Sequence, residues 1–406
     1  MSTPEDLSNL DPAFDGVLRP VAAGATSCEY FQDRNKRWPF HCDDEGYRLL
    51  ARLLRAATPV VGAVQAKIDA ACDVADDPNG RAAADAVVAE GQRIYARKPN
   101  MGEHDVTWSQ EEYGHLGLQK EYIRYKSVQR LTEAWACLQR AKRAGLFFEL
   151  DETPLKENET PSVPLRWASL GGGPGFELLA VKWFFEKHFP RYNLDLVSLD
   201  LEASWREAAE GLGLRFNTWD VRDGDGLERA AGGPVDYAVA SYVLKMYMAN
   251  EPCARWLGEK LNSASNRLRA ALIVSRDENL EAASRLVRDA SIGNATVVPL
   301  MDPNGGRDDR QLAFAPGGWT RPTNAAGEPR EAALTFPNVP YEEHKRRRGG
   351  GGHGGGHGNH QGGRHHQGGG GGFREGGFRR GNGGGWSDHR RDRGDRGDRP
   401  RDTGRW

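Results

Sequence analysis

The sequence predicts an α/β fold built on a doubly wound, mainly parallel sheet, with a helical N-terminal unit before it and a disordered tail after it. Between residues 165 and 315, short apolar runs alternate with helical patterns, and the first run leads into a glycine-rich turn. Alternating strands and helices of this length specify a parallel sheet with helices on both faces. From Lys345 onward the chain is rich in Gly, Arg and His, with too little apolar surface to form a core.

Length and composition limit the classes of protein to consider. The 406 residues are 38% hydrophobic and 28% charged, which suits one large core or two modest domains. No apolar run approaches the ~20 residues that cross a bilayer. The acidic residues 1–16 lack the pattern of a secretory signal, so we expect an intracellular protein with no membrane partner. The five cysteines are scattered and form no CxxC pair, which predicts reduced thiols and no structural metal.

The charge is divided unevenly along the chain. The formal net charge is −2, but residues 345–406 carry 15 Lys and Arg against 6 Asp and Glu, whereas residues 1–344 carry 40 against 51. An acidic body with a basic end indicates a tail that faces nucleic acid.

The first part of the chain has helical character. Residues 1–27 show no sustained period and are predicted to be disordered, and residues 28–150 are predicted to form a helical domain. Its helices are expected at Tyr47–Val64, Ala82–Ala96 and Glu121–Ala144. Pro59 should interrupt the first helix, and Gly145 should end the third. The polar, proline-punctuated residues 151–164 are predicted to be a linker.

Residues 165–318 are predicted to form the sheet domain, followed by a linker over 319–344 and the tail over 345–406. The strands are expected at Leu165–Leu170, Asp195–Asp200, Leu214–Val221, Val235–Ser241, Ala270–Ser275 and Thr296–Leu300. The helices between them are expected to begin at Glu177 and to cover Ala203–Gly211, Cys253–Leu268 and Glu278–Ala290. Gln311–Ala315 is predicted to add a last, short edge strand.

The glycine-rich turn is the strongest indication of a binding site. Gly171, Gly173 and Gly175 lie between the first strand and the first helix of the sheet domain. Glycine accepts positive φ and lets a ligand approach the backbone, and a helix N-terminus offers unpaired N–H groups. Phe176 stands where a dinucleotide-binding fingerprint has its third glycine, which disfavours nicotinamide or flavin binding.

The series Gly171-x-Gly173-x-Gly175, with the strand ends that follow it, resembles the first motif of class I S-adenosylmethionine-dependent methyltransferases. The resemblance covers residues 165–315 and implies a Rossmann-like sheet that binds S-adenosylmethionine at these three glycines. It also implies that Asp200, at the end of the second strand, accepts hydrogen bonds from both ribose hydroxyls. A two-oxygen acceptor suits two hydroxyl donors at fixed spacing.

The third and fourth strands continue the resemblance. It implies that Asp220 takes the adenine amino group, that Val221 offers a backbone N–H, and that Ser241 lines the floor of the site beside the methyl group. Asp223 or Asp225 could replace Asp220 if the strand ends later, and a packing role is the alternative for Ser241.

One position departs from the family pattern. The family commonly has Asp or Glu two residues before its first motif glycine, to hold the methionine amino group, whereas this sequence has Ser169. Glu177 is close enough in sequence to compensate. The partner of the methionine carboxylate could come from Tyr122, Arg124 or Tyr125 on the preceding helix, although a core role is the main alternative for the two tyrosines.

Methyl transfer from a sulfonium needs alignment more than a strong base, so the sequence assigns no catalytic residue. The fourth strand lacks the [DN]PP[FY] motif of adenine amino methylation, which makes that target less favoured. Cys253 follows a proline, as the nucleophile of cytosine C5 enzymes does, but a buried or capping thiol is the favoured interpretation.

The tail predicts a nucleic-acid partner. Its arginines alternate with glycine runs and with aromatic residues, a pattern similar to the glycine-arginine-rich segments of RNA-binding proteins. We therefore expect a methyltransferase acting on RNA or a ribonucleoprotein component that residues 345–406 recruit. The alternatives are an inactive RNA-binding adaptor of the same fold and a small-molecule methyltransferase with an incidental tail. The basic run Lys345–Arg348 favours a nuclear or nucleolar location over a cytoplasmic one.

Overall fold

The computed structural model describes residues 14, 18–20, 28–30, 41–42, 44–97, 108–152, 164–248, 251–263, 268–274, 295–300 and 311–323. All of them belong to one compact unit, Met1–Gly351. The α-helices are α1 Asp44–Ala71, α2 Gly80–Arg97, α3 Gln110–Gly114, α4 Leu116–Ala144, α5 Phe148–Glu152, α6 Phe176–His188, α7 Arg206–Gly211, α8 Leu227–Ala231 and α9 Glu251–Asn262. The strands are β1 Leu18–Pro20, β2 Cys28–Tyr30, β3 His41–Cys42, β4 Leu165–Leu170, β5 Leu194–Asp200, β6 Arg215–Thr218, β7 Tyr237–Ser241, β8 Ala270–Val274, β9 Thr296–Pro299 and β10 Gln311–Ala315.

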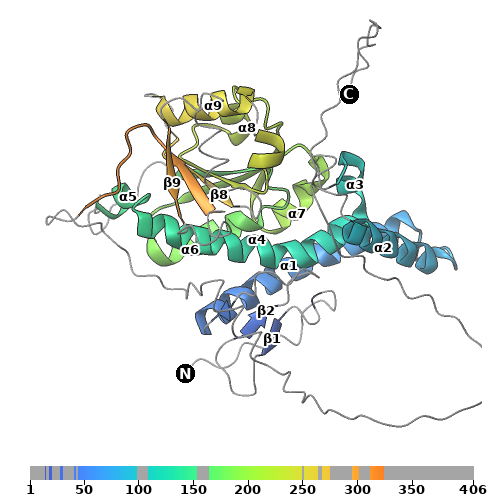
Figure 1. Ribbon diagram of the computed structural model, residues 1–406. Helices are drawn as coiled ribbons and strands as arrows, with labels where there is room; N and C mark the ends of the chain where they lie inside the picture. The colour runs from blue at the N-terminus through green and yellow to red at the C-terminus, as the bar shows by residue number, and fades with distance from the viewer. Residues whose placement is uncertain are drawn as a thin grey trace, which may run out of the picture. The chain divides into compact units, whose positions relative to one another are not determined.

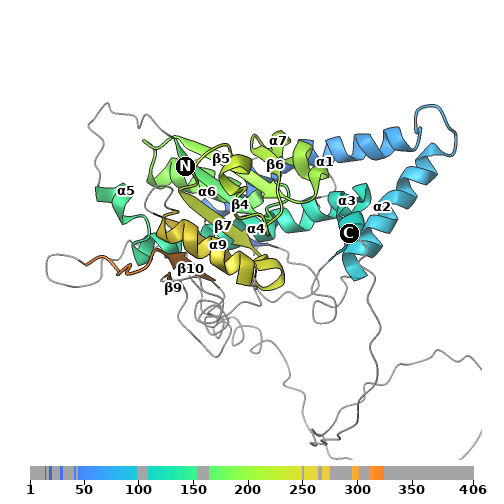
Figure 2. The same cartoon turned by 90° about the horizontal axis from the view of Figure 1, so that it is seen from above.

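Seven strands form the main sheet in the order β6-β5-β4-β7-β8-β10-β9. The pairs from β6 to β8 are parallel, and β10 is antiparallel to both of its neighbours. This mixed, mainly parallel sheet confirms the predicted doubly wound, Rossmann-like α/β fold. The chain first moves from β4 through β5 to β6 and then returns to β7, so the strand order reverses beside β4 (Figure 2). Open α/β sheets bind ligands at the carboxyl ends of strands near such a reversal.

The prediction that Gln311–Ala315 is an edge strand is wrong. This segment, β10, lies between β8 and β9, and all five of its residues are buried. Leu312 and Phe314 pack with the core on one face of the sheet, and Ala313 and Ala315 with the core on the other. A strand that is apolar on both faces is favoured inside a sheet, which leaves the edge to the partly exposed β9.

Several boundaries differ from those predicted. β6 ends at Thr218 rather than at Val221, so Trp219, Asp220 and Val221 lie in the turn that follows it. The predicted helix Ala203–Gly211 begins as a 3-10 turn, η2 Ala203–Trp205, before α7. The sequence did not predict α8 or the π-helical turn η3 Leu244–Met248. The predicted helix Glu278–Ala290 and the tail lie outside the described residues.

α1 runs through Pro59 without a break, contrary to the prediction. Pro59 is exposed, whereas Leu54, Ala57 and Val61 are buried and continue one apolar face across it. Packing of that face outweighs the hydrogen bond that proline removes. Residues 48–71 of this helix are long and apolar enough to cross a membrane by length and composition, but half of the most apolar window is buried inside the protein, as in a core helix.

Short elements also occur where the sequence predicted none. β1 lies within residues 1–27 and pairs with β2, which pairs with β3, in a small antiparallel sheet. α5 extends over the first two residues of the predicted linker 151–164. α3 begins with a capping box in which Ser109 and Glu112 bond to each other's backbone N–H groups.

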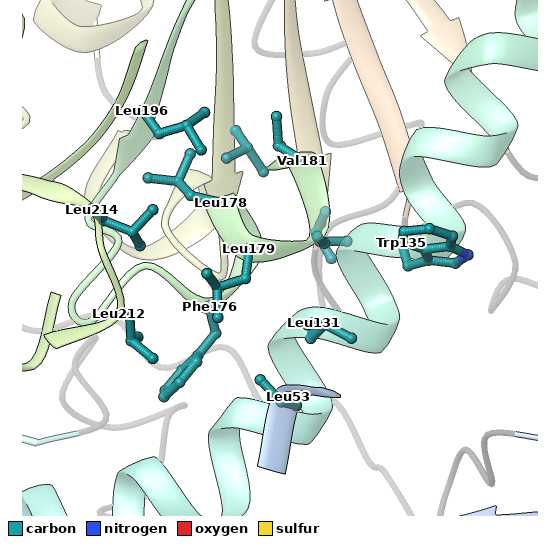
Figure 3. Close-up of a cluster of buried hydrophobic side chains, with 14 of the residues drawn as sticks. Leu53, Leu131, Trp135, Phe176, Leu178, Leu179, Val181, Leu196, Leu212 and Leu214 are labelled. Atoms are coloured by element: carbon teal, nitrogen blue, oxygen red, sulfur yellow. The ribbon is translucent and has the colours of Figure 1, made fainter. Parts of the chain in front are cut away.

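α4 joins the N-terminal helices to the sheet. It packs against α1, α2 and α6 (Figure 1). Gly145 ends the helix, as predicted, and does so in the left-handed conformation with φ 89°. One hydrophobic cluster contains Leu53 of α1, Leu131 and Trp135 of α4, and Phe176 of α6 (Figure 3). The helices and the sheet therefore share a single core on this face, and α4 is held close to the carboxyl ends of the strands.

Candidate cofactor site at the carboxyl ends of the strands

The glycine turn connects β4 to α6 in a conformation that few other residues adopt. Gly171, Gly173 and Gly175 have φ values of 65°, 52° and 85°. A Cβ built on Gly173 would make ordinary van der Waals contact with the Trp205 ring, at 3.8 Å, so the positive φ and not crowding selects glycine. Gly175 is the N-cap of α6 and makes no side-chain cap hydrogen bond. Gly171 is the exposed residue of the turn, and Gly173 and Gly175 are buried, so the turn presents backbone without side chains beside the strand ends.

Asp200 is the last residue of β5 and is bonded to this turn. Its Oδ2 accepts a hydrogen bond from the Gly173 N–H at 2.8 Å, and its Oδ1 accepts one from the Glu202 N–H at 2.9 Å. Burial raises the pKa of Asp200, and the backbone hydrogen bonds act against that rise. Each carboxylate oxygen has a further lone pair, so Asp200 can still accept two hydroxyl groups.

The turn after β6 holds Asp220 in an ion pair. The Arg222 guanidinium approaches its carboxylate to 2.5 Å, and hydrogen bonding from Arg222 lowers the pKa of Asp220. The Val221 carbonyl accepts a hydrogen bond from Trp256 Nε1 at 3.0 Å, which fixes the turn against α9. The alternative residue Asp223 accepts hydrogen bonds from the Gly226 N–H and from Arg229.

The end of β7 carries two unusual features. Ser241 is buried, and its Oγ has no hydrogen-bond partner among the described residues. Tyr242 follows with φ 64°, a strained value for a residue other than glycine, and such strain concentrates at functional sites. Its hydroxyl donates to the Glu133 carboxylate at 2.9 Å and accepts from Gln129 Nε2 at 2.6 Å. The Arg130 guanidinium lies 4.1 Å from the centre of its ring.

Ser169 and Glu177 form a buried pair beside the glycine turn. Ser169 Oγ donates a hydrogen bond to Glu177 Oε1 at 2.5 Å, and both residues are almost completely buried. Burial raises the pKa of Glu177, while the charge of Arg130 and the Ser169 hydrogen bond lower it. The first turn of α6 thus carries a carboxylate close to the position where β4 lacks one.

Arg130 of α4 is the residue that sequence reasoning missed. Burial acts to lower its pKa, but interactions with Tyr122, Glu177, Tyr242 and Glu133 outweigh this and raise it. Its Nη1 is buried without a hydrogen-bond partner among the described residues. Helical periodicity offered a signal, because Arg130 lies eight residues after Tyr122 and therefore within about 80° of it around the helix.

The three residues of α4 that the sequence suggested as carboxylate partners lie in two different environments. Arg124 pairs with Glu121 at 4.0 Å and stacks over the Tyr125 ring, which itself stacks on Tyr95. Tyr122 instead lies beside Trp205, with ring centroids 5.1 Å apart, and interacts with Glu177 and Asp200. Only Tyr122 of the three sequence-based candidates is brought to the site.

Two further tyrosines surround Asp200. Tyr113 of α3 and Tyr247 of η3 are hydrogen-bonded to each other, and both interact with Asp200 and Tyr122. Burial is the main cause that raises the pKa of both hydroxyls. These rings make the surroundings of the Asp200 carboxylate poor in water.

Cys253 is fully buried in the first turns of α9, with Sγ 3.6 Å from the carbonyl oxygens of Val221 and Tyr247. This agrees with a buried thiol and not with an accessible nucleophile. In the part of the chain that the structure describes, no group of three His, Cys, Asp or Glu side chains is arranged to hold a metal ion.

No protein-family model and no curated protein matches the sequence. Among solved structures, an O-methyltransferase family protein from Burkholderia thailandensis is similar at 16% identity and a TM-score of 0.31, over 57% of this chain and 72% of that one. The citrinin polyketide synthase CMeT domain is similar at 12% identity and a TM-score of 0.30, over 63% and 65%. The CurJ carbon methyltransferase is similar at 13% identity and a TM-score of 0.28, over 57% and 71%.

Proposed function

We propose that this protein is an S-adenosylmethionine-dependent methyltransferase. The observation that carries the proposal is the hydrogen bond of 2.8 Å between the Asp200 carboxylate and the Gly173 N–H. It joins an acidic strand end to a glycine turn with positive φ, at the point where the strand order reverses. A carboxylate beside a turn without side chains suits the ribose hydroxyls of a nucleoside and the chain that extends from it.

The residues present fit the cofactor at three places. Asp200 can accept both ribose hydroxyls, Gly173 presents backbone without a side chain beside the Trp205 ring, and buried charges of opposite sign lie nearby on Glu177 and Arg130. At the adenine end, Asp220 would have to exchange its Arg222 partner for the adenine amino group.

When bound, S-adenosylmethionine supplies a methyl group on a sulfonium, which is a good leaving group. The chain's own residues align the reactants and exclude water. Tyr113, Tyr122 and Tyr247 interact with Asp200 and limit the access of water to its carboxylate. At the end of β7, Tyr242 is hydrogen-bonded to the Glu133 carboxylate, so this pair can take a proton from an acceptor atom beside the strand end.

RNA or a ribonucleoprotein component is the acceptor class that we propose. It is supported by the arginine, glycine and aromatic composition of residues 345–406, since such segments bind single strands by charge and stacking. Incubation with labelled methyl donor and total cellular RNA or protein distinguishes the alternatives. Label in RNA or in a ribonucleoprotein component supports the proposal, and binding of RNA without any label transfer favours the inactive adaptor. Methyl transfer that is unchanged when residues 345–406 are deleted favours an incidental tail. A nuclear location remains a prediction for fluorescence microscopy of the tagged protein.

The cofactor proposal is tested by calorimetric titration with S-adenosylhomocysteine, the demethylated product. Asp200→Ala removes two hydrogen bonds to a charged acceptor, each contributing about 1.5 kcal/mol or more, so affinity should fall roughly 100-fold or further. Asp85→Ala, at an exposed position of α2, is the matched control and should leave affinity unchanged. Wild-type protein that shows neither heat nor thermal shift with the product would contradict the proposal.

A further inference from the structure

We propose that Glu177 and Arg130 together hold the zwitterionic amino-acid end of the cofactor, with Glu177 receiving the ammonium group and Arg130 the carboxylate. This inference rests on the proposed function and deepens it. Glu177, in the first turn of α6, would take the role that the family commonly gives to an acidic residue at the position of Ser169. Arg130, which binds the carboxylate, lies on α4, a helix that precedes the sheet in the chain.

Glu177 is built to receive a cation. It is 2% exposed, and the Ser169 hydroxyl fixes its Oε1 at 2.5 Å. Ionised carboxylates are rarely buried without a charged partner, because the loss of hydration is costly. The groups that face Glu177 are Arg130 and Tyr122 of α4 and Asp200 of β5, and only Arg130 carries positive charge. Glu177 and Asp200 therefore make this region attractive to an ammonium group.

Arg130 is built to receive an anion. Its guanidinium lies over the Tyr242 ring, and Gln129 and Glu133 on the same helix hold the Tyr242 hydroxyl, so the ring that supports the guanidinium is fixed. The buried Nη1 has no partner among the described residues. An arginine fork that is oriented and incompletely paired suits the two oxygens of a carboxylate.

The two charges complement a zwitterion better than they complement each other. Among the described residues, Arg130 and Glu177 interact electrostatically, yet no direct ion pair joins them. An α-amino acid carries its ammonium and carboxylate on one carbon, so it can bridge opposite charges that are held apart. Ser169 then has a clear function, because its hydroxyl orients the carboxylate that has moved from β4 to α6.

The test compares two ligands that share the nucleoside and the sulfur but differ in the amino-acid end. Calorimetric titrations with S-adenosylhomocysteine and with 5′-methylthioadenosine are run on the wild type, Arg130→Met, Arg130→Lys and Glu177→Gln. Loss of one charge-assisted contact should weaken S-adenosylhomocysteine binding about 10- to 100-fold and leave 5′-methylthioadenosine within about twofold of the wild type. Arg130→Lys should recover part of the loss, because it keeps the charge without the fork. Arg124→Met, on the same helix but paired with Glu121, is the control and should bind both ligands normally.

The outcomes separate this inference from the function on which it rests. Wild-type protein that binds neither ligand contradicts the proposed function. Wild-type binding of both ligands, with Arg130 and Glu177 variants that weaken them equally or not at all, overturns only the inference. If Arg130→Met fails to fold in a thermal melt, Glu177→Gln and Arg130→Lys decide the result.

Discussion

Buried charge is concentrated in a few residues beside the glycine turn. Glu177, Arg130 and Asp200 lie where water is largely excluded, and each is stabilised by particular contacts: the Ser169 hydroxyl, the Tyr242 ring and the Gly173 N–H. Such groups cost folding free energy unless they are fully paired, and they are retained where a ligand completes the pairing. At the scale of single residues, the proposed site would therefore exchange folding stability for ligand binding.

The pH dependence of stability tests this exchange. Burial raises the pKa of Glu177 despite Arg130 and Ser169, so the folded protein holds this proton more tightly than the unfolded chain does. The stability that the group contributes is complete below its unfolded pKa and is lost as pH rises through the folded value. Glu177→Gln lacks this loss, so its melting temperature should increase relative to that of the wild type as the pH rises above the ordinary pKa of a glutamate.

Asp200, whose pKa burial also raises, is present in both proteins, and its carboxylate repels that of Glu177, so Glu177→Gln also eases the ionisation of Asp200 and changes stability in the same direction. A difference in melting temperature that stays constant across the pH range would contradict the burial of an ionisable Glu177. The same variant should bind S-adenosylhomocysteine more weakly while being more stable at neutral pH, which separates lost recognition from lost folding.

At the scale of elements, the position of α4 depends on its contact with α2. A Cβ on Gly91 would lie 1.9 Å from the Gly117 carbonyl carbon, so the two helices cross with backbone against backbone. Glycine at such a crossing lets the two helix backbones approach to a distance that leaves no room for a side chain. Because α4 supplies Arg130 and Glu133, this helix crossing also positions the site.

Two alanine substitutions test the crossing. Gly91→Ala should destabilise the protein by about 2 kcal/mol or more, because the added methyl group meets backbone that cannot rotate away. Gly62→Ala, on α1 with no atom within 4 Å of the added Cβ, should stabilise it by about 0.5 to 1 kcal/mol through helix propensity alone. Urea unfolding midpoints measure both changes, and a stabilising Gly91→Ala would show that the helices do not cross this closely.

At the scale of the whole molecule, the helices and the sheet depend on each other. α4 and α6 pack together in one hydrophobic cluster with α1, so the side of α6 that packs on α4 has no cover without the N-terminal helices. Each large apolar side chain that loses its cover forfeits about 2 kcal/mol, and several would be exposed at once.

Two truncations test this dependence. A protein that lacks residues 1–150 should fail to give a cooperative thermal transition, because its core would be open on one face. A protein that ends at Gly351 keeps every described residue, so its melting temperature and its affinity for S-adenosylhomocysteine should match those of the full chain. A soluble, cooperatively folded sheet domain made without residues 1–150 would show that the shared cluster is not needed.

The sequence by itself determined the local features of this protein. Alternating apolar periods specified the parallel sheet, the spacing of Gly171, Gly173 and Gly175 specified the positive-φ turn, and Gly145 specified where α4 ends. Each of these follows from sterics and periodicity within a few residues, which short-range sequence encodes.

Only the tertiary structure decided which distant residues meet. It carried α1 through Pro59, because packing along the helix outweighed one local cost, and it inserted β10 between β8 and β9, because a strand apolar on both faces is favoured in the sheet interior. It also brought Arg130 rather than Arg124 toward Glu177, since helix crossing and core packing fix which face of α4 is turned to the strand ends. These outcomes depend on the burial of surfaces that are far apart in the chain, so the local patterns permit them without deciding them.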